Sequence, residues 1–509
     1  MANSIDQTLQ FINRQDEENI TQKLAARFKL PYVNLVNYPI VSDILHIVPE
    51  DIAEKYNLVS YLRAGKIIKV ATTRPDNAEV FKIIADLKRS TELDFVLAVC
   101  SESSYRYAMH LYKLYPSKTI TSEKVEVTEA QKQEYKAEIQ NLVDLKEKIK
   151  KVSATNLIDV IFAGAVAVNA SDVHLEPEET DLKIRYRIDG VLQTVTELPL
   201  SAHKILISRI KYLAKLKLDI NNQPQDGRFE VTAAGKPFDI RVSTLPSAYG
   251  ETVVMRLLSR EGKFISLEQL GFSPDGIKTI HNAITKPNGI IFNTGPTGSG
   301  KTTTLYAILT ELNKPGVKII TLEDPIEYRI KGINQSQVEQ EKGYTFASGL
   351  RSILRQDPDI IMVGEIRDKE TAEIAINAAL TGHLVLTTLH TNNAASALPR
   401  LLEMGVEPFL LAGVVNLIIA QRLVRKTCPK CLGKGCIECN NLGYKGRIAI
   451  AELLVPDKEI EDLIARKASL REFEDTAKKV GMKTMREDGM DKVKNGTTSQ
   501  AEVDRVVQE

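Results

Sequence analysis

A glycine-rich segment of eight residues limits the folds open to this chain more than any other part of the sequence. Residues 295–302 read GPTGSGKT and fill every fixed position of the phosphate-loop pattern. We expect an apolar strand before the segment, at Gly289–Asn293, and a helix after it, at Thr302–Leu312. In that setting the glycines let backbone N–H groups surround a phosphate, and the helix N-terminus favours its charge. This context argues against a glycine-rich turn that binds nothing.

The last two residues of the segment predict contacts to a nucleotide and a metal ion. The Lys301 ammonium would reach the β and γ phosphates, and the Thr302 hydroxyl would ligate Mg²⁺. The surrounding region, residues 285–425, alternates short apolar strands with helices. Such a pattern is typical of a parallel sheet covered on both faces, so we predict an α/β fold. The further strands are expected at Lys318–Leu322, Ile360–Val363 and Leu384–Thr388, and the tail from Glu459 onward is expected to be helical.

Carboxylates follow two of these strands. Glu365 comes directly after the strand that ends at Val363, although Gly364 stands where phosphate-loop proteins usually carry an Asp. Glu323 and Glu327 follow the strand that ends at Leu322. Hydrolysis needs one acid to orient or activate water and one near the metal, and parallel strands end at the same edge of a sheet. The spacing alone does not assign these roles, and each acid taken singly could be an ordinary loop carboxylate.

Two histidines bracket another strand. His383 and His390 lie on either side of Leu384–Thr388, close to several threonines. A neutral donor or acceptor there would suit a sensor of the γ-phosphate. On local evidence a structural role is the better interpretation of each.

The 509-residue length predicts about three domains, and the sequence before the phosphate loop divides accordingly. Residues 1–115 predict a small α/β domain, with strands at 67–71 and 95–99 and a helix at 77–87 between them. Residues 116–153 lack Gly and Pro apart from Pro116 and mix Lys with Glu, which indicates a charged helical linker. Residues 154–260 show hairpin turns and strands of period two, so we predict an α+β domain on an antiparallel sheet. Its helices are expected at 156–168 and 203–216.

Four of the five cysteines lie within twelve positions. Cys428, Cys431, Cys436 and Cys439 form two Cys-x-x-Cys pairs four residues apart. Each pair alone could be a redox site, but two pairs this close favour a closed, structural Zn²⁺ site. The basic residues around the cluster form either a solvated face or a docking surface for an acidic partner. Cys100, at the end of an apolar strand, is expected to be a core residue.

Composition excludes several classes of protein. A net charge of +1 and the lack of interleaved basic and aromatic residues argue against binding nucleic acid. The N-terminus lacks the apolar core of a signal peptide. The longest apolar stretch, Phe409–Ala420, is shorter than the roughly 20 residues that span a bilayer, so we expect a buried helix there. We therefore expect a cytoplasmic protein that reaches the inner membrane only through a partner.

Four ordered motifs resemble those of the secretion ATPase superfamily, specifically the assembly motors of type IV pili and their type II secretion counterparts. They are similar to that family's Walker A, Asp box, Walker B and His box: Gly295–Thr304, Thr321–Glu327, Leu350–Asp368 and Thr381–Asn392. Smaller matching segments are Ser171–His174, Gln225–Arg228, Asp239–Ser243, Gln421–Leu423 and Met485–Gly489. The resemblance is dense over about residues 150–509 and looser over residues 1–115.

The resemblance implies a fold and a set of roles. It implies a RecA-like ATPase domain at 261–509 with a tetracysteine insert at 428–439, preceded by a PAS-like domain at 154–260. It implies Glu327 as the residue that activates water, Glu365 as the Walker B acid, and Glu323 as a further Asp-box acid. The other implied catalytic residues are the sensors His383 and His390 and the arginines Arg228, Arg241 and Arg256, which would approach the γ-phosphate. The implied ATP contacts are Gly295, Pro296, Thr297, Gly298, Ser299, Gly300, Lys301, Thr302 and Thr303.

The same resemblance implies partners. Family members form ring hexamers, so a homohexamer is implied. Residues 1–115 are implied to dock an inner-membrane platform protein or a cytoplasmic partner. The tetracysteine insert is similar to that of assembly motors and is typically absent from the shorter retraction motors. Residues 1–115 contain no Arg-Leu-Gly motif of the kind that binds cyclic di-GMP in some relatives, so binding of that nucleotide is not expected.

These features predict an ATP-hydrolysing motor that drives pilin polymerisation. A type II secretion motor that extrudes a pseudopilus fits the sequence as well. A DNA-handling ATPase is disfavoured by the balanced charge, and a scaffold that binds ATP without hydrolysing it is disfavoured by Glu327 and Glu365.

Overall fold

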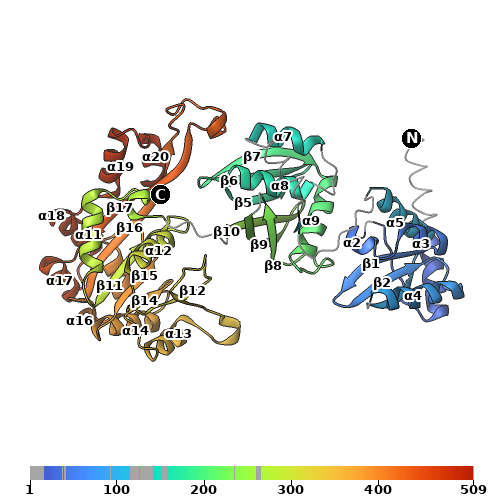
Figure 1. Cartoon of the computed structure of the whole chain (residues 1–509), viewed down its shortest axis with the longest axis horizontal. Helices are drawn as coiled ribbons and strands as arrows, with labels where there is room; N and C mark the ends of the chain where they lie inside the picture. The colour runs from blue at the N-terminus through green and yellow to red at the C-terminus, as the bar shows by residue number, and fades with distance from the viewer. Residues whose placement is uncertain are drawn as a thin grey trace. The chain divides into compact units, whose positions relative to one another are not determined.

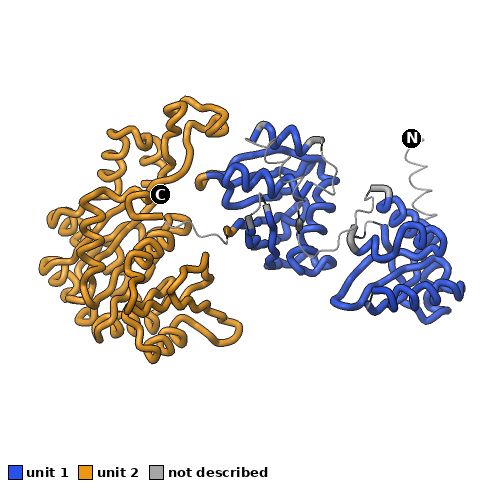
Figure 2. The backbone as a smooth tube through the Cα atoms, in the orientation of Figure 1, with its two compact units in different colours: residues 1–188, 192–257 blue, residues 189–191, 258–509 orange. Residues whose placement is uncertain are grey.

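The chain groups into two compact units, shown in Figure 2. The computed structural model describes residues 16–36, 38, 40, 42–91, 93–114, 125–126, 142–151, 157–233, 236–259 and 265–507. Unit 1 comprises Met1–Ile188 and Leu192–Leu257, and unit 2 comprises Asp189–Val191 and Leu258–Glu509. Each unit is described by itself.

The first part of unit 1 is a small sheet covered by helices (Figure 1). Its strands β1 (Leu58–Ala64), β2 (Ile67–Thr72) and β3 (Asp94–Val99) lie in the order β1-β2-β3. The strands predicted at 67–71 and 95–99 and the helix predicted at 77–87 are confirmed by β2, β3 and α4 (Ala78–Thr91). Cys100 is 2% exposed in this core, as expected. The other helices are α2 (Ser42–Leu45), α3 (Glu50–Tyr56) and α5 (Glu102–Leu114).

The second part of unit 1 is a seven-stranded sheet in the order β4-β8-β9-β10-β5-β6-β7. The alternating sequence pattern is confirmed, because neighbours β5–β6 and β8–β9 pair antiparallel and bury one face against α8 and α9. The elements are β5 (Ala170–Pro177), β6 (Asp181–Ile188), β7 (Val191–Pro199), β8 (Gln225–Ala233), β9 (Lys236–Ser247), β10 (Gly250–Ser259), α8 (Leu157–Ala167) and α9 (Ser201–Leu213).

The helical interpretation of residues 116–153 is right in one place and wrong in another, and their role as a linker stays a prediction. Helix α7 (Leu142–Lys151) confirms the helical interpretation near its end. At Val125–Glu126, however, the chain forms strand β4, which pairs parallel with β8 through Val125 and Val231. A sheet edge offers unpaired backbone groups to any neighbouring segment, and charge patterning carries no sign of that pairing. The rest of residues 116–153, apart from 142–151, lies outside the described residues.

Unit 2 is built on a seven-stranded sheet in the order β13-β12-β14-β15-β11-β16-β17. All pairs are parallel except β16–β17, which confirms the predicted parallel core. The strands are β11 (Gly289–Thr294), β12 (Ile319–Glu323), β13 (Asn334–Gln337), β14 (Ile360–Val363), β15 (Leu384–Leu389), β16 (Val415–Thr427) and β17 (Tyr444–Leu454).

Helices cover both faces of this sheet, as Figure 1 shows. Successive residues of a strand point to opposite faces, so Ile290 and Phe292 enter one core and Ile291 enters the other. One core is shared with α10 (Leu267–Leu270), α11 (Pro274–Ile284) and α12 (Lys301–Leu312). The other is shared with α13 (Phe346–Leu354), α14 (Lys369–Leu380), α15 (Ala397–Glu403), α16 (Pro408–Leu411) and the C-terminal helices.

The buried helix expected at Phe409–Ala420 is wrong for most of its length. Only Pro408–Leu411 is helical, and Val415–Thr427 forms β16, which pairs parallel with β11 and antiparallel with β17. A short apolar run does not distinguish a buried helix from a buried strand. The β-branched residues at 415, 418 and 419 favour the strand, in which they are buried between β11 and β17. Among the helices in the described part of the chain, none is long and apolar enough to cross a membrane.

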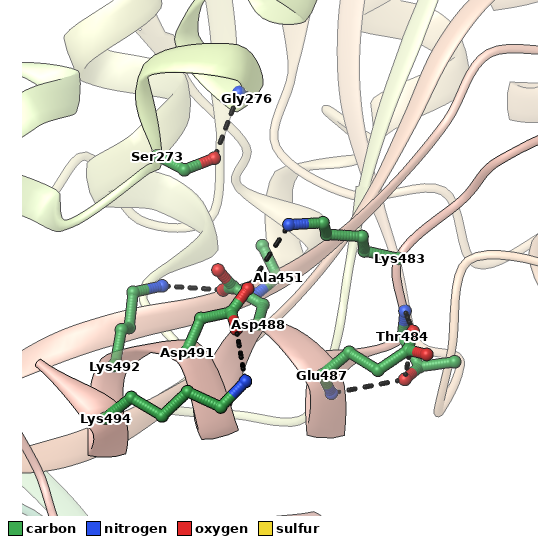
Figure 3. Close-up of polar contacts among 10 residues, drawn as sticks. All are labelled: Ser273, Gly276, Ala451, Lys483, Thr484, Glu487, Asp488, Asp491, Lys492 and Lys494. Carbon is green, nitrogen blue, oxygen red and sulfur yellow. Dashed lines mark hydrogen bonds and ion pairs between the residues drawn. The ribbon is translucent and has the colours of Figure 1, made fainter.

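The predicted helical tail is confirmed by α17 (Lys458–Ala465), α18 (Leu470–Lys479), α19 (Met485–Lys494) and α20 (Gln500–Val507). Figure 3 shows how α19 is fixed. Thr484 and Glu487 form a capping box at its start. The Asp488 carboxylate accepts hydrogen bonds from the Ala451 N–H at 2.9 Å and from Lys492 Nζ at 2.6 Å, which ties α19 to β17.

Candidate active site

The phosphate-loop segment lies where the parallel strands β11 and β15 end, beside the middle of β16. Thr294, the last residue of β11, pairs with Leu389 of β15 and Ala420 of β16. The chain then turns through residues 295–300 before α12 begins at Lys301. Gly298 and Gly300 have φ angles of 80° and 88°, in the region where glycine is strongly favoured. The sequence therefore forms the predicted strand, loop and helix, with the helix N-terminus open to an anion.

Lys301 is held against the loop itself. Its Nζ donates hydrogen bonds to the carbonyl oxygens of Gly295, at 2.7 Å, and Pro296, at 3.1 Å. Burial lowers the pKa of this lysine to about 8, against the opposing influence of the nearby Glu365 carboxylate. Thr302 follows in the first turn of α12, where its hydroxyl can hold a metal ion that also binds phosphate.

Glu365 lies at the same edge of the sheet. It comes two residues after β14, and His390 directly follows β15, the strand paired with β14. His390 Nε2 is 3.3 Å from one Glu365 carboxylate oxygen, and Arg367 Nη2 is 2.5 Å from the other. The Glu365 side chain is 13% exposed, so water screens it only weakly. Its charge therefore interacts more strongly with Lys301, His390 and Arg367 than it would at an open surface. The structure thus brings Lys301, Glu365 and His390 together.

The two Asp-box glutamates have different surroundings. Glu323, the last residue of β12, is 2% exposed, and burial raises its pKa. Its carboxyl group accepts hydrogen bonds from Tyr306, from Thr321 at 2.5 Å and from Gln335 at 3.2 Å. Glu327 lies on the loop after β12 and is exposed. Glu323 is therefore enclosed by protein donors, whereas Glu327 is accessible to water.

His383 lies at the opposite end of the strands from the phosphate loop, just before β15 begins. It precedes β15, its carbonyl accepts from the Gly289 N–H at 3.2 Å, and its ring Nδ1 is 2.9 Å from the Ala378 carbonyl at the end of α14. A six-residue strand is about 20 Å long. The structure therefore separates His383 from the phosphate loop of its own chain.

The three arginines of the resemblance lie in unit 1. Arg228 and Arg241 face each other across β8 and β9. Arg256, on β10, places its Nε 2.9 Å from an Asp172 oxygen, and its side chain is 56% exposed. Their approach to a γ-phosphate stays a prediction.

The cysteine cluster lies in the loop between β16 and β17. The sulfur atoms of Cys428, Cys431, Cys436 and Cys439 all lie within 4.8 Å of one another. Three pairs are separated by 3.6, 3.7 and 3.9 Å. Four thiolates about 2.3 Å from one Zn²⁺ would be about 3.8 Å apart at the corners of a tetrahedron. The cluster therefore has the shape of a closed zinc site.

Backbone N–H groups donate to the sulfur atoms of two of these cysteines, but burial still raises the pKa of the Cys431 thiol to about 11. The Gly435 N–H is 3.2 Å from Cys431 Sγ, and the Cys436 and Gly443 N–H groups are 3.2 and 3.3 Å from Cys439 Sγ. Burial alone would raise the pKa of the Cys439 thiol, but these two amide bonds, with the contacts from the Cys431 and Cys436 side chains, lower it to about 7. Thiolates are the ligand form that zinc requires.

Comparison with known proteins decides the family. Residues 147–505 match the family described as type II/IV secretion system protein. The chain belongs to this family. Among secretion-family relatives, the type IV pilus assembly ATPase PilB of Myxococcus xanthus is 39% identical, over 96% of this chain and 91% of the relative. The type II secretion system protein HxcR of Pseudomonas aeruginosa is 47% identical, over 73% of this chain and 81% of the relative.

A solved structure supports the same assignment. The ATPase DotB of Legionella pneumophila is 27% identical, with a TM-score of 0.54, over 69% of this chain and 95% of that protein. Family membership confirms the resemblance drawn from the four motifs, and the family fold is an α/β ATPase fold.

Sequence reasoning missed two contributors to this secretion-family site. Arg367 contacts Glu365, and the Gln421 side chain contacts the phosphate loop from β16. The sequence places Gln421 in a matching segment but gives it no role, because a contact across 122 residues leaves no local signal.

Proposed function

We propose that this chain is the ATP-hydrolysing motor that drives pilin polymerisation in type IV pilus assembly. The observation that carries the proposal is the gathering of Lys301, Glu365 and His390 at the sheet edge where the phosphate loop begins. Similarity to a pilus assembly ATPase along nearly the whole chain supports the pilus over other substrates.

The chemistry follows from the positions of these residues. The loop amides and the Lys301 ammonium bind the β and γ phosphates, and the Thr302 hydroxyl and the Glu365 carboxylate provide oxygen ligands or water contacts for Mg²⁺. Glu327, exposed on the neighbouring loop, orients or deprotonates the attacking water. The water oxygen bonds to the γ-phosphorus as the bond to the β-γ bridging oxygen breaks, giving ADP and phosphate. His390 contacts Glu365 and reports the loss of the γ-phosphate.

Movement arises if hydrolysis changes how parts of an assembly contact one another. We propose a homohexamer in which Arg228, Arg241 and Arg256 stabilise charge that develops on the γ-phosphate. Arginine suits this role because its planar fork stays charged at any working pH. Residues 154–260 act as the PAS-like domain that carries these arginines, residues 116–153 as the linker, and residues 1–115 as the part that docks an inner-membrane platform protein. The motor works in the cytoplasm, and the cysteine cluster holds a structural Zn²⁺.

A second function is carried by a separate observation. Several relatives that share 44–48% identity over about 70% of this chain are type II secretion proteins, and HxcR is one of them. The same ATPase chemistry would then extrude a pseudopilus to export folded proteins.

Deleting the gene in its source organism separates these functions. We expect loss of surface pili with export of folded proteins retained, and restoration of pili by the wild-type gene but not by a Lys301→Ala gene. Loss of protein export with normal pili would replace the first function by the second. Normal pili and normal export would contradict both.

A further inference from the structure

We propose that Gln421 is a positioning residue for the nucleotide phosphates: its side-chain amide holds the Ser299–Gly300 peptide so that the Gly300 N–H points into the phosphate cradle. This inference rests on the proposed function, because it concerns how the same loop binds ATP. Gln421 belongs to the Gln421–Leu423 segment, to which neither the family match nor the chemistry above gives a role.

Gln421 touches the phosphate loop and the start of α12 from a neighbouring strand. It follows Ala420, which pairs with the last residue of β11, and its side chain is completely buried. Its Nε2 donates to the Ser299 carbonyl at 3.0 Å, and its Oε1 accepts from the Thr304 hydroxyl at 2.7 Å. Both functional atoms of the amide are therefore used, one on the loop and one on the helix.

The glycines of the loop show how closely β16 approaches it. A Cβ at Gly300 would lie 2.9 Å from Gln421 Nε2, and a Cβ at Gly295 would lie 2.5 Å from the Gln421 carbonyl oxygen. A side chain at Gly295 or Gly300 would therefore collide with Gln421. Their positive φ angles favour glycine as well.

The planarity of the peptide bond turns this contact into a positioning effect. In a trans peptide the C=O of one residue and the N–H of the next point in opposite directions. The bond from Gln421 fixes the Ser299 C=O toward β16, so the Gly300 N–H faces the opposite side, where the loop curls around phosphate. Thr304 holds the amide in this orientation, and its own N–H bonds to the Gly300 carbonyl at 3.0 Å.

The side chain at position 421 must accept a hydrogen bond from Thr304 and donate one to the Ser299 carbonyl, and an uncharged amide can do both. A carboxylate at position 421 could still accept from Thr304 but would set an oxygen against the Ser299 carbonyl. Protonation would restore the missing donor, and burial raises the pKa of a carboxyl group. The charged groups near this point are Lys301 on α12, Arg422 on β16, Glu452 on β17 and Glu365 beyond β14.

The test measures the dissociation constant of a fluorescent ADP analogue for the purified full chain, between pH 6 and 8. The variants are Gln421→Met, Gln421→Glu and Thr304→Val, and each constant is divided by the wild-type value at the same pH. This ratio removes the titration of Lys301 and of the phosphate, which all the proteins share. Melting temperatures check that each variant is folded.

We expect Gln421→Met to weaken ADP binding about tenfold or more at every pH, as loss of an oriented donor and a buried hydrogen bond should. Gln421→Glu should be weaker still at pH 8 and should recover at least fivefold relative to wild type by pH 6. Thr304→Val, which keeps the bond to Ser299, should lose less than about threefold.

Several outcomes overturn the inference. Binding by folded Gln421→Met within twofold of wild type would do so, and so would equal, pH-independent loss in Gln421→Met and Gln421→Glu. A Thr304→Val loss as large as that of Gln421→Met would assign the effect to packing. If Gln421→Met does not fold, the other two variants test the inference. It then stands only if Gln421→Glu recovers binding at pH 6 and Thr304→Val loses less than about threefold. Failure of wild type itself to bind ADP would instead contradict the proposed function.

Discussion

At the scale of single residues, the site keeps a lysine in a place where its charge is unfavourable. Lys301 is buried, and two loop carbonyls replace only part of the water it gives up on folding. Its pKa is about 8 rather than its usual 10.5. A bound phosphate would supply the missing negative charge, so the lysine is prepared for an anion at a cost to the stability of the nucleotide-free chain.

This cost predicts a dependence of stability on pH. The unfolded chain binds more protons than the folded chain between pH 8 and 10.5, so the free energy of unfolding should rise with pH across this window. The rise attributable to Lys301 is at most about 3 kcal/mol. We expect the difference in melting temperature between wild type and Lys301→Met to change over this window. Lys494→Met, at a position whose side chain is 74% exposed, should show no such change. A constant difference for Lys301→Met would contradict the account.

The two histidines predict unequal effects on turnover. His390→Ala removes the contact to Glu365 and should lower kcat about tenfold to a hundredfold. His383→Ala acts at the other end of β15 and should leave kcat within about threefold, with some loss of melting temperature because its ring contacts the end of α14. Steady-state ATP hydrolysis by the two variants decides this, and a larger loss in His383→Ala would place that ring at the site of another subunit.

The sequence predicted the site residues that belong to a local motif. The phosphate loop and Glu365 were found because each has a fixed spacing relative to a strand. The sequence could not predict the hydrogen bonds from Tyr306 and Gln335 to Glu323. Nor could it predict the hydrogen bond from Gln421 to the phosphate loop. Those contacts depend on which strands become neighbours, and strand order is a property of the whole sheet.

At the scale of elements, β16 connects the phosphate loop with the cysteine cluster. Gln421 contacts the loop near the middle of this strand, and Cys428 follows its last residue. The sequence did not predict this arrangement, because the apolar part of β16 is also compatible with a buried helix. The pairing with β11 and β17 decides in favour of the strand.

Helix α20 fastens the outer end of β16. Glu502 accepts hydrogen bonds from the Arg425 N–H at 3.0 Å and from Arg425 Nη2 at 2.6 Å. Burial alone would raise the Glu502 pKa, but the bonds from Arg425 and Arg505 lower it to about 2. The ionised Glu502 carboxylate therefore stabilises the fold fully above pH 4.5. This stabilisation is lost as the pH falls from 4.5 toward 2, because the carboxylate is then protonated.

Glu502→Gln should therefore lower the free energy of unfolding by about 2–3 kcal/mol at pH 7, measured as a lower melting temperature. The deficit should shrink below pH 4.5. Glu459→Gln is the matched control, because its ion pair with Lys479 is largely exposed and should contribute less than about 1 kcal/mol. Equal melting temperatures for Glu502→Gln and Glu459→Gln would contradict the structural role of Glu502.

The cysteine cluster predicts one zinc ion per chain. Elemental analysis of the purified chain should find it, and Cys431→Ser should lower both the zinc content and the melting temperature. Cys100→Ser, at a buried position outside the cluster, should keep the zinc. A metal-free wild-type chain in which the four cysteines form disulfides would contradict the assignment.

At the scale of the whole molecule, the residues implied in catalysis are divided between the two units. The phosphate loop and its acids lie in unit 2, whereas Arg228, Arg241 and Arg256 lie in unit 1. We propose that such a division suits a motor, because hydrolysis does work when it changes how separately moving parts contact one another. Sequence patterning predicted the two kinds of sheet, but the pairing of Val125–Glu126 with β8 lay beyond it.

The proposed motor depends on hydrolysis of ATP at this phosphate loop. The most direct measurement is phosphate release from ATP by the purified full chain, compared with Lys301→Ala, with melting temperatures confirming that both are folded. We predict steady turnover by the wild type, at least about a hundredfold lower turnover by Lys301→Ala, and a melting temperature that ADP raises only in the wild type. Equal turnover by the two proteins would contradict the proposal.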